Sequence, residues 1–126
     1  MSNDESGDNK PARPYDLEER TAKFGEEAIC LARSIQVNPV TTPLITQLVR
    51  SATSIGANYG EANDAGTKKE FKYRISVCRR ESKECKHWLR MMAAAASDSR
   101  TEARRLWQEA KELNLIFSSI FRSCGQ

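Results

Sequence analysis

The chain has little of what catalytic and metal-binding sites are usually made from. Its 126 residues include a single histidine, His87. One histidine excludes a site with several histidine ligands and leaves few ways to activate a nucleophile. The motif Glu84-Cys85-Lys86-His87 matches the Glu-x-x-His pair of di-iron bundles, but such sites need two copies of the motif and further carboxylates. We therefore expect no catalytic residues, no metal and no cofactor, in a protein that is not an enzyme.

Long apolar runs are also missing. No segment reaches the roughly 18 apolar residues that predict a membrane span, and the N-terminus, MSNDESGDNKPARP, lacks the apolar stretch of a signal peptide. The sequence therefore predicts a cytoplasmic protein without a membrane segment. Residues 1–14 are expected to form a disordered tail, and residues 15–124 to form one domain around one core.

Helix breakers and paired cysteines are scarce as well. Only four prolines and six glycines interrupt the chain, and the dominant residues, Ala, Leu, Glu, Lys and Arg, favour helix throughout. No two of the four cysteines have the Cys-x-x-Cys spacing of zinc sites. The sequence favours buried, reduced thiols over a disulfide framework. The cysteines are Cys30, Cys78, Cys85 and Cys124.

Two helices are predicted in the first half of the chain, where apolar residues alternate at spacings of four and three. The first opens at Asp16 and ends before Asn38-Pro39, because the residue before a proline avoids the α region. The second starts at Thr42-Pro43, with Thr42 as N-cap and proline at the first helical position, and ends at Gly66.

Two more helices are predicted in the second half. Thr67–Glu70 and Ser99–Glu102 both read as capping boxes, which start helices over about 68–96 and about 100–123. Four apolar stripes joined by short connections give an all-α, antiparallel up-down-up-down four-helix bundle. The predicted core positions of the third helix are Phe71, Ile75, Cys78, Ser82, Cys85, Leu89 and Met92.

The stretch RSATSIGANYGEANDAG, residues 50–66, is unusually rich in small residues. Ile55 and Tyr59 continue the apolar stripe of the second helix through it, so it is predicted as helix rather than loop. Each glycine inside a helix lowers stability by about 1 kcal/mol relative to alanine, and close packing of a neighbouring group, inside the bundle or at a subunit contact, should offset that loss. The residues expected to pack closely are Ala52, Gly56 and Gly60.

Positive charge is concentrated in the third predicted helix. Residues 67–90 hold nine cations and three acids, a net +6, whereas residues 16–37 hold three cations and five acids, a net −2. At 100° per residue, most of these cations fall within an arc of about 60°, and Arg100, Arg104 and Lys111 share a similar arc on the fourth helix beside Trp107. The candidate nucleic-acid-binding residues are Lys68, Lys72, Arg79, Lys83, Lys86, Arg90, Arg104 and Lys111.

This stripe has three interpretations that the sequence leaves open. A basic stripe over ~30 Å could track a phosphate backbone, with affinity that falls as the salt concentration rises. It could instead face an acidic surface of another subunit, or be ordinary surface charge. No aromatic ring accompanies the stripe on the third helix, so we expect no sequence recognition there. The alternative function is a purely structural or scaffolding homo-oligomer that mediates protein–protein contacts.

The opposite flank of the third helix combines its three glutamates with large apolar residues. Such a flank is too apolar for free solvent and predicts a subunit interface. The candidate interface residues are Tyr73, Val77, Trp88 and Met91.

The segments LVRSATSIGANYGEA and KKEFKYRISVCRRESKECKHWL resemble the small bacterial four-helix-bundle proteins known as 23S rRNA intervening sequence proteins. YDLEERTAKFGEEAICLA fits the family's opening segment, and the resemblance covers residues 15–122. It implies an up-down bundle that assembles as a homopentamer, similar to the accessory protein of diversity-generating retroelements. That relative associates with a reverse transcriptase and nucleic acid. RNA, DNA and a polymerase-type protein are therefore expected partners, and the family offers no catalytic residues to transfer.

Overall fold

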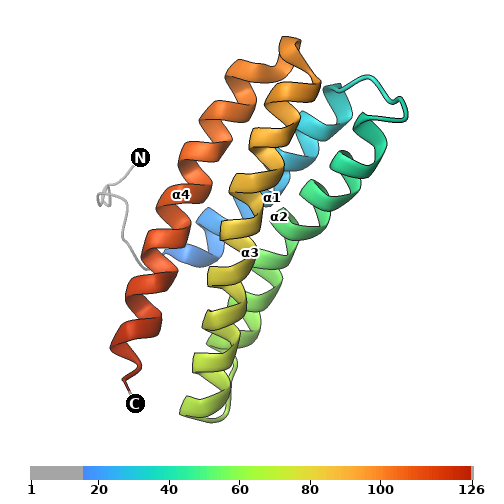
Figure 1. The fold of residues 1–126 in the computed structure, drawn as a ribbon. Coiled ribbons are helices and arrows are strands. Elements are labelled where there is room, and N and C mark those ends of the chain that lie inside the picture. The colour runs from blue at the N-terminus through green and yellow to red at the C-terminus, as the bar shows by residue number, and fades with distance from the viewer. Residues whose placement is uncertain (1–15, 126) are drawn as a thin grey trace, which may run out of the picture.

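The computed structural model describes residues 16–125, and four long helices account for most of them. They are α1 (Leu17–Ser34), α2 (Thr41–Asn63), α3 (Lys68–Ala95) and α4 (Arg100–Ser123). A single 3₁₀ turn, Ser97–Ser99, precedes α4. Figure 1 shows the helices running alternately up and down, with α3 and α4 side by side and joined at one end. The predicted all-α four-helix bundle is confirmed, whereas the tail expected over residues 1–14 lies outside the described residues.

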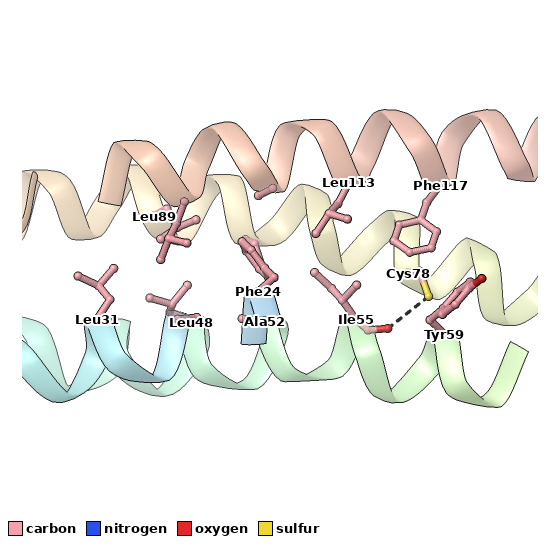
Figure 2. Packing of buried hydrophobic residues seen from close by; sticks show 14 of the residues in the cluster. Phe24, Leu31, Leu48, Ala52, Ile55, Tyr59, Cys78, Leu89, Leu113 and Phe117 are labelled. Carbon is pink, nitrogen blue, oxygen red and sulfur yellow. Dashed lines mark hydrogen bonds between the residues drawn. The ribbon is translucent and has the colours of Figure 1, made fainter. Parts of the chain in front are cut away.

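The core is one apolar cluster along the axis of the bundle. Figure 2 shows Phe24, Ile55, Leu113 and Phe117 pointing into the space between the helices. All predicted core positions of α3 from Ile75 to Met92 are buried, and burial of this apolar surface is the main force that holds the bundle together. Among the helices described, none combines the length and the apolar character needed to cross a membrane.

Helices α3 and α4 both start where they were predicted, but only α3 has the predicted cap. Thr67 caps α3, because its side chain accepts a hydrogen bond from the Glu70 N–H at 3.0 Å. Ser99 makes no such bond at the start of α4. Glu102, the expected partner of Ser99, instead pairs with Arg105 at 2.6 Å. The second capping box was therefore wrong.

The start of α2 also differs from the prediction. The helix begins at Thr41, so Thr42 is not its N-cap. The Asn38 carboxamide oxygen accepts hydrogen bonds from the N–H groups of Val40 and Thr41, each at 2.9 Å. The Thr41 hydroxyl donates to the Gln36 carbonyl at 2.6 Å. Local side-chain bonds of Asn and Thr thus shape this connection and set the first residue of the helix.

Helices α1 and α2 approach closely where small residues face one another. A Cβ built on Gly56 would lie 3.4 Å from the Thr21 hydroxyl oxygen, and a Cβ built on Gly25 would lie 3.6 Å from the Ala52 carbonyl oxygen. Ala52 and Gly56, two of the predicted close-packing residues, lie in this contact. Gly25 of α1 faces Ala52, a contact that the sequence did not indicate, and Thr21 of α1 faces Gly56. Small residues on both helices are what bring the two backbones together here.

Gly60 does not belong to this contact, so the close packing predicted there is not found within the described bundle, and packing of Gly60 at a subunit contact stays a prediction. No atom of the described residues lies within 4 Å of a Cβ built on Gly60. Successive contacts pair Gly25 with Ala52 and Thr21 with Gly56, so the same register places Leu17, the first residue of α1, opposite Gly60. Since α1 begins at Leu17, the close contact between the two helices ends at this turn.

Candidate nucleic-acid interface

The basic stripe of α3 lies on the side of the helix that faces α4. The Lys72 amine and the Arg79 guanidinium lie 5.0 Å and 5.1 Å from the centre of the Phe121 ring. The Lys86 amine lies 5.7 Å from the centre of the Trp107 ring. Both rings belong to α4. The stripe therefore follows the seam between the two helices, which lie side by side in Figure 1.

Helix α4 adds its own cations to the same surface. The Lys111 amine also lies 5.7 Å from the centre of the Trp107 ring, and Arg104 lines one hollow together with Arg90 of α3. Lys68 lines another hollow, next to the C-terminal end of α4. We call the face of this seam the basic surface. Lys83, four residues after Arg79, lies on the same side of α3 by helical periodicity. With it, the basic surface comprises the eight predicted cations Lys68, Lys72, Arg79, Lys83, Lys86, Arg90, Arg104 and Lys111.

These cations have no acidic partner within residues 16–125. The ion pairs of this part of the chain join Arg20 to Glu109 and Glu112, Arg50 to Glu81 and Glu84, and Arg105 to Glu27 and Glu102. Within residues 16–125, the one hydrogen bond that a side chain of these eight cations donates runs from the Lys72 amine to the Gly125 carbonyl at 2.7 Å. The positive charge of this surface is thus not balanced by neighbouring carboxylates.

Aromatic rings accompany the stripe after all, which corrects the expectation that none would. Trp107 and Phe121 are half-buried in the seam, each between two cations of the basic surface. Such rings can stack on nucleobases of any sequence. The sequence placed Trp107 beside the cations of the fourth helix, but helical periodicity does not show which residues of the third helix lie next to it. Only the antiparallel register of α3 and α4 brings residue 107 next to residue 86.

The acidic flank of α3 packs against α2. Arg50 of α2 donates to Glu81 at 3.3 Å and to Glu84 at 2.9 Å. Arg74 of α3 donates to the Asn58 carboxamide oxygen of α2 at 3.0 Å. These bonds connect α2 and α3 within one chain. Because Glu81 is also buried, its carboxylate is not accessible to a partner protein.

The apolar residues of that flank differ in how much surface they leave for a subunit contact. Val77 is only 6% exposed, so it presents almost no free surface, which corrects its place among the interface candidates. Trp88 and Met91 are half-buried, and Trp88 packs against the core. Tyr73 is 57% exposed and is the one clearly accessible ring of the four. Within a single chain, the flank is therefore less open than its sequence indicated.

Residues that resembled a metal site or a nucleophile have structural partners. Glu84 binds Arg50, and His87 is exposed with its ring edge-on to Trp88, 4.9 Å between ring centres. Burial raises the pKa of the Cys78 and Cys85 thiols to about 12, so both stay protonated as core side chains. Cys30 is exposed, contrary to the prediction of buried thiols.

Comparisons with known proteins agree with the bundle. A family model described as "23S rRNA-intervening sequence protein" matches residues 16–119. A crystal structure from Bacteroides thetaiotaomicron, of a protein with unknown function from the S23 ribosomal protein family, superposes with a TM-score of 0.74. The two chains are 21% identical over 86% of this chain and 97% of that one, a level at which the likeness shows the fold. A comparison with curated proteins found no match.

Proposed function

We propose that this chain, which belongs to the 23S rRNA-intervening sequence protein family, is a non-enzymatic oligomeric accessory protein that binds RNA or DNA. The observation that supports the proposal is the basic surface, whose eight cations have no carboxylate partner within the described chain. Lysine and arginine side chains on such a surface bind phosphates. Phosphate contacts carry no sequence information, so the binding has no strong sequence preference.

The length and spacing of the basic surface suit a phosphate backbone. Lys68 and Arg90 are 22 residues apart on one helix, which corresponds to about 33 Å at 1.5 Å per residue. Each phosphate that the surface neutralises releases counterions from the nucleic acid. The affinity should therefore fall steeply as the salt concentration rises.

Oligomerisation is the second part of the proposal, with a homopentamer as the expected state. The resemblance described above implies it, and the exposed ring of Tyr73 gives a subunit contact a starting point. An oligomer presents several copies of the basic surface to one strand, which raises the overall affinity without any new contact. Sedimentation velocity at micromolar concentration is the test, and a monomer would contradict this part. Association with a polymerase-type protein stays a prediction from the resemblance.

A scaffolding oligomer that binds only protein is the second candidate function. Two large apolar side chains favour it, because Tyr73 and Leu115 are 57% and 59% exposed. Tyrosine in particular is enriched at protein interfaces. This candidate predicts that neither RNA nor DNA binds the basic surface, so one titration separates the two functions.

The test is a binding titration with RNA and with DNA at low and at physiological salt. One variant carries Lys72→Glu, Arg79→Glu, Lys83→Glu and Lys86→Glu. A matched control carries Lys23→Glu, Arg33→Glu, Lys69→Glu and Arg80→Glu, four exposed cations outside the basic surface. Both variants change the formal net charge from +3 to −5, because each of the four reversals removes two positive charges.

We expect the wild type to bind at low salt and to weaken at physiological salt. The variant on the basic surface should lose at least about a hundredfold in affinity, because four phosphate contacts become repulsive, and the matched control should lose much less. Equal losses would mean that net charge, and not this surface, attracts the nucleic acid. Absence of binding to the wild type at low salt would favour the scaffolding candidate.

A further inference from the structure

One end of the basic surface contains a groove that is lined by three arginines. It lies between the C-terminal half of α3 and the N-terminal half of α4 and has a volume of about 560 Å³. Three arginines, Arg90, Arg100 and Arg104, line it together with Trp107. We call this hollow the arginine groove. Its size falls within the range of about 300–1,000 Å³ typical of small-ligand sites.

Small residues create the space. Ala93 and Ala94 of α3 and Ala103 of α4 line the groove between the arginines. Alanine extends only one carbon from the backbone, so the three positions leave room that longer side chains would fill. The floor is therefore apolar, and the charged groups stand at its edges.

The charge of the groove is of one sign. No acidic residue lines it, and none of the three arginines has a carboxylate partner within residues 16–125. Three guanidinium groups around one hollow repel one another. A bound anion would attract all three, and this attraction would offset their mutual repulsion. Guanidinium forks bind phosphate oxygens in pairs, which makes arginine the side chain best suited to a phosphate group.

An aromatic ring stands next to these arginines. Trp107 lies three residues after Arg104, so it is about one helical turn away along α4. The amines of Lys86 and Lys111 each lie 5.7 Å from the centre of its ring. A base that stacked on the indole would displace an amine from this position. The displaced lysine would then lie beside the next phosphate of the same strand.

We propose that the arginine groove holds the terminal nucleotide of a single strand that ends in a phosphomonoester, with the phosphate on Arg90, Arg100 and Arg104 and the base on Trp107. The inference rests on the proposed function and adds the form of nucleic acid. A phosphomonoester carries about −1.5 to −2 charge at pH 7 and three acceptor oxygens, whereas an internal phosphodiester carries one charge. Three arginines match the monoester. The single lysines spaced along α3 match internal phosphates.

The position of the groove agrees with a strand end. Helix α3 ends at Ala95, five residues after Arg90, and the α3–α4 connection follows. The cations of α3 therefore run from Lys68 toward the groove and stop there. A strand that follows them reaches its last nucleotide at the arginine groove.

The test compares single strands of one sequence that carry a 5′-phosphate, a 3′-phosphate or hydroxyl groups at both ends. Binding is measured by fluorescence anisotropy at one fixed ionic strength. The variant Arg90→Gln/Arg104→Gln removes two charges from the groove. The control Lys68→Gln/Lys83→Gln removes two exposed charges from the basic surface outside the groove. Because all four side chains are exposed, both variants should remain folded, which circular dichroism checks.

We expect one phosphorylated strand to bind the wild type roughly tenfold more tightly than the hydroxyl strand, a gain typical of one charge-assisted contact. The groove variant should lose this preference. The control should keep it while binding all strands more weakly. Equal affinity for all three strands, or a preference that survives Arg90→Gln/Arg104→Gln, would overturn the inference and leave the proposed function intact.

A second measurement tests whether the terminal base stacks on Trp107. The chain has two tryptophans, so Trp88→Phe leaves Trp107 as the only indole. We expect the phosphorylated strand to quench Trp107 fluorescence more than the hydroxyl strand does, and adenosine monophosphate to quench it weakly. Quenching by the free mononucleotide, with no strand bound at low salt, would identify a nucleotide site instead. That result would contradict both the inference that the groove binds the end of a strand and the proposed function.

Discussion

The two flanks of α3 carry similar kinds of residues and use them differently. On the flank that faces α2, Glu81 and Glu84 bind Arg50, and Val77 is covered by its own chain. On the flank that faces α4, cations stand beside aromatic rings and have no carboxylate partner within the described residues. The charged groups of the first flank form ion pairs that stabilise the fold, whereas those of the second flank remain available to bind another molecule.

This difference separates two roles that a helical wheel treats alike. A charged side chain that is paired inside the chain contributes to stability, and its removal should destabilise the bundle. A charged side chain without a partner contributes little to stability, and its removal should change only binding. Four predictions examine this contrast, in order of expected effect.

Replacing Glu81 with alanine should give the largest loss of stability. The side chain is buried and accepts a hydrogen bond from Arg50, and bonds to charged groups contribute about 1.5–3 kcal/mol. We expect the free energy of unfolding to fall by that amount in urea titrations at one fixed protein concentration. Lys83→Ala, two residues further along and on the other side of the same helix, should change it by less than about 0.5 kcal/mol. Equal losses would remove the distinction between the flanks.

Replacing Gly56 with leucine should also destabilise the bundle, because α2 would be pushed away from α1. A Cβ alone would already lie 3.4 Å from the Thr21 hydroxyl oxygen, and overpacking of this kind costs about 1–3 kcal/mol. Gly60→Leu is the matched change in open space and should cause no such loss. Urea titrations of the two variants provide the comparison. If Gly56→Leu were as stable as the wild type, the close approach of α1 and α2 would not depend on this glycine.

Replacing Asn114 with alanine should lower the free energy of unfolding by about 1 kcal/mol. Its carboxamide donates to the Arg79 carbonyl at 2.8 Å and to the Ser82 hydroxyl at 3.2 Å, so it links α4 to α3 through neutral groups. The loss should be the same in low and in high salt, whereas the loss in Glu81→Ala should shrink in high salt because an ion pair is screened. A strong salt dependence of the Asn114 effect would contradict a neutral link.

Replacing Gly60 with alanine should give the smallest effect, a gain of up to about 1 kcal/mol from helix propensity. The added methyl group meets no described atom within 4 Å. Thermal unfolding at fixed protein concentration measures the gain. A loss of stability, or a smaller assembly in sedimentation, would show that another subunit packs against this glycine.

Much of the fold followed from local sequence patterns. The Thr67–Glu70 capping bond starts α3 where it was expected, and the stripe from Ile75 to Met92 is buried without exception. Two other local predictions were wrong because neighbouring side chains form different bonds. Asn38 accepts hydrogen bonds from the N–H groups of Val40 and Thr41, and α2 begins before the expected N-cap Thr42. Arg105 pairs with the carboxylate of Glu102.

The candidate site was harder to predict than the fold, because it depends on which residues of a neighbouring helix lie opposite each cation. The segregation of cations along one side of α3 was visible from helical periodicity, and so was the neighbouring arc of α4. Nothing in that periodicity placed Trp107 beside Lys86, or gathered Arg90, Arg100 and Arg104 around one groove. The register between the antiparallel helices α3 and α4 determines which of their residues lie next to one another.

By itself, the sequence determined the four helices, the faces that they bury and the separation of charge around α3, because each depends on residues within one or two helical turns. Only the tertiary structure decided that α2 pairs with the acidic flank, that Val77 is covered and that Gly60 has no described neighbour. These outcomes depend on how side chains of different helices interlock. This packing sets the register between two helices and the residues at which their contact ends, and the sequence pattern of a single helix does not contain that information.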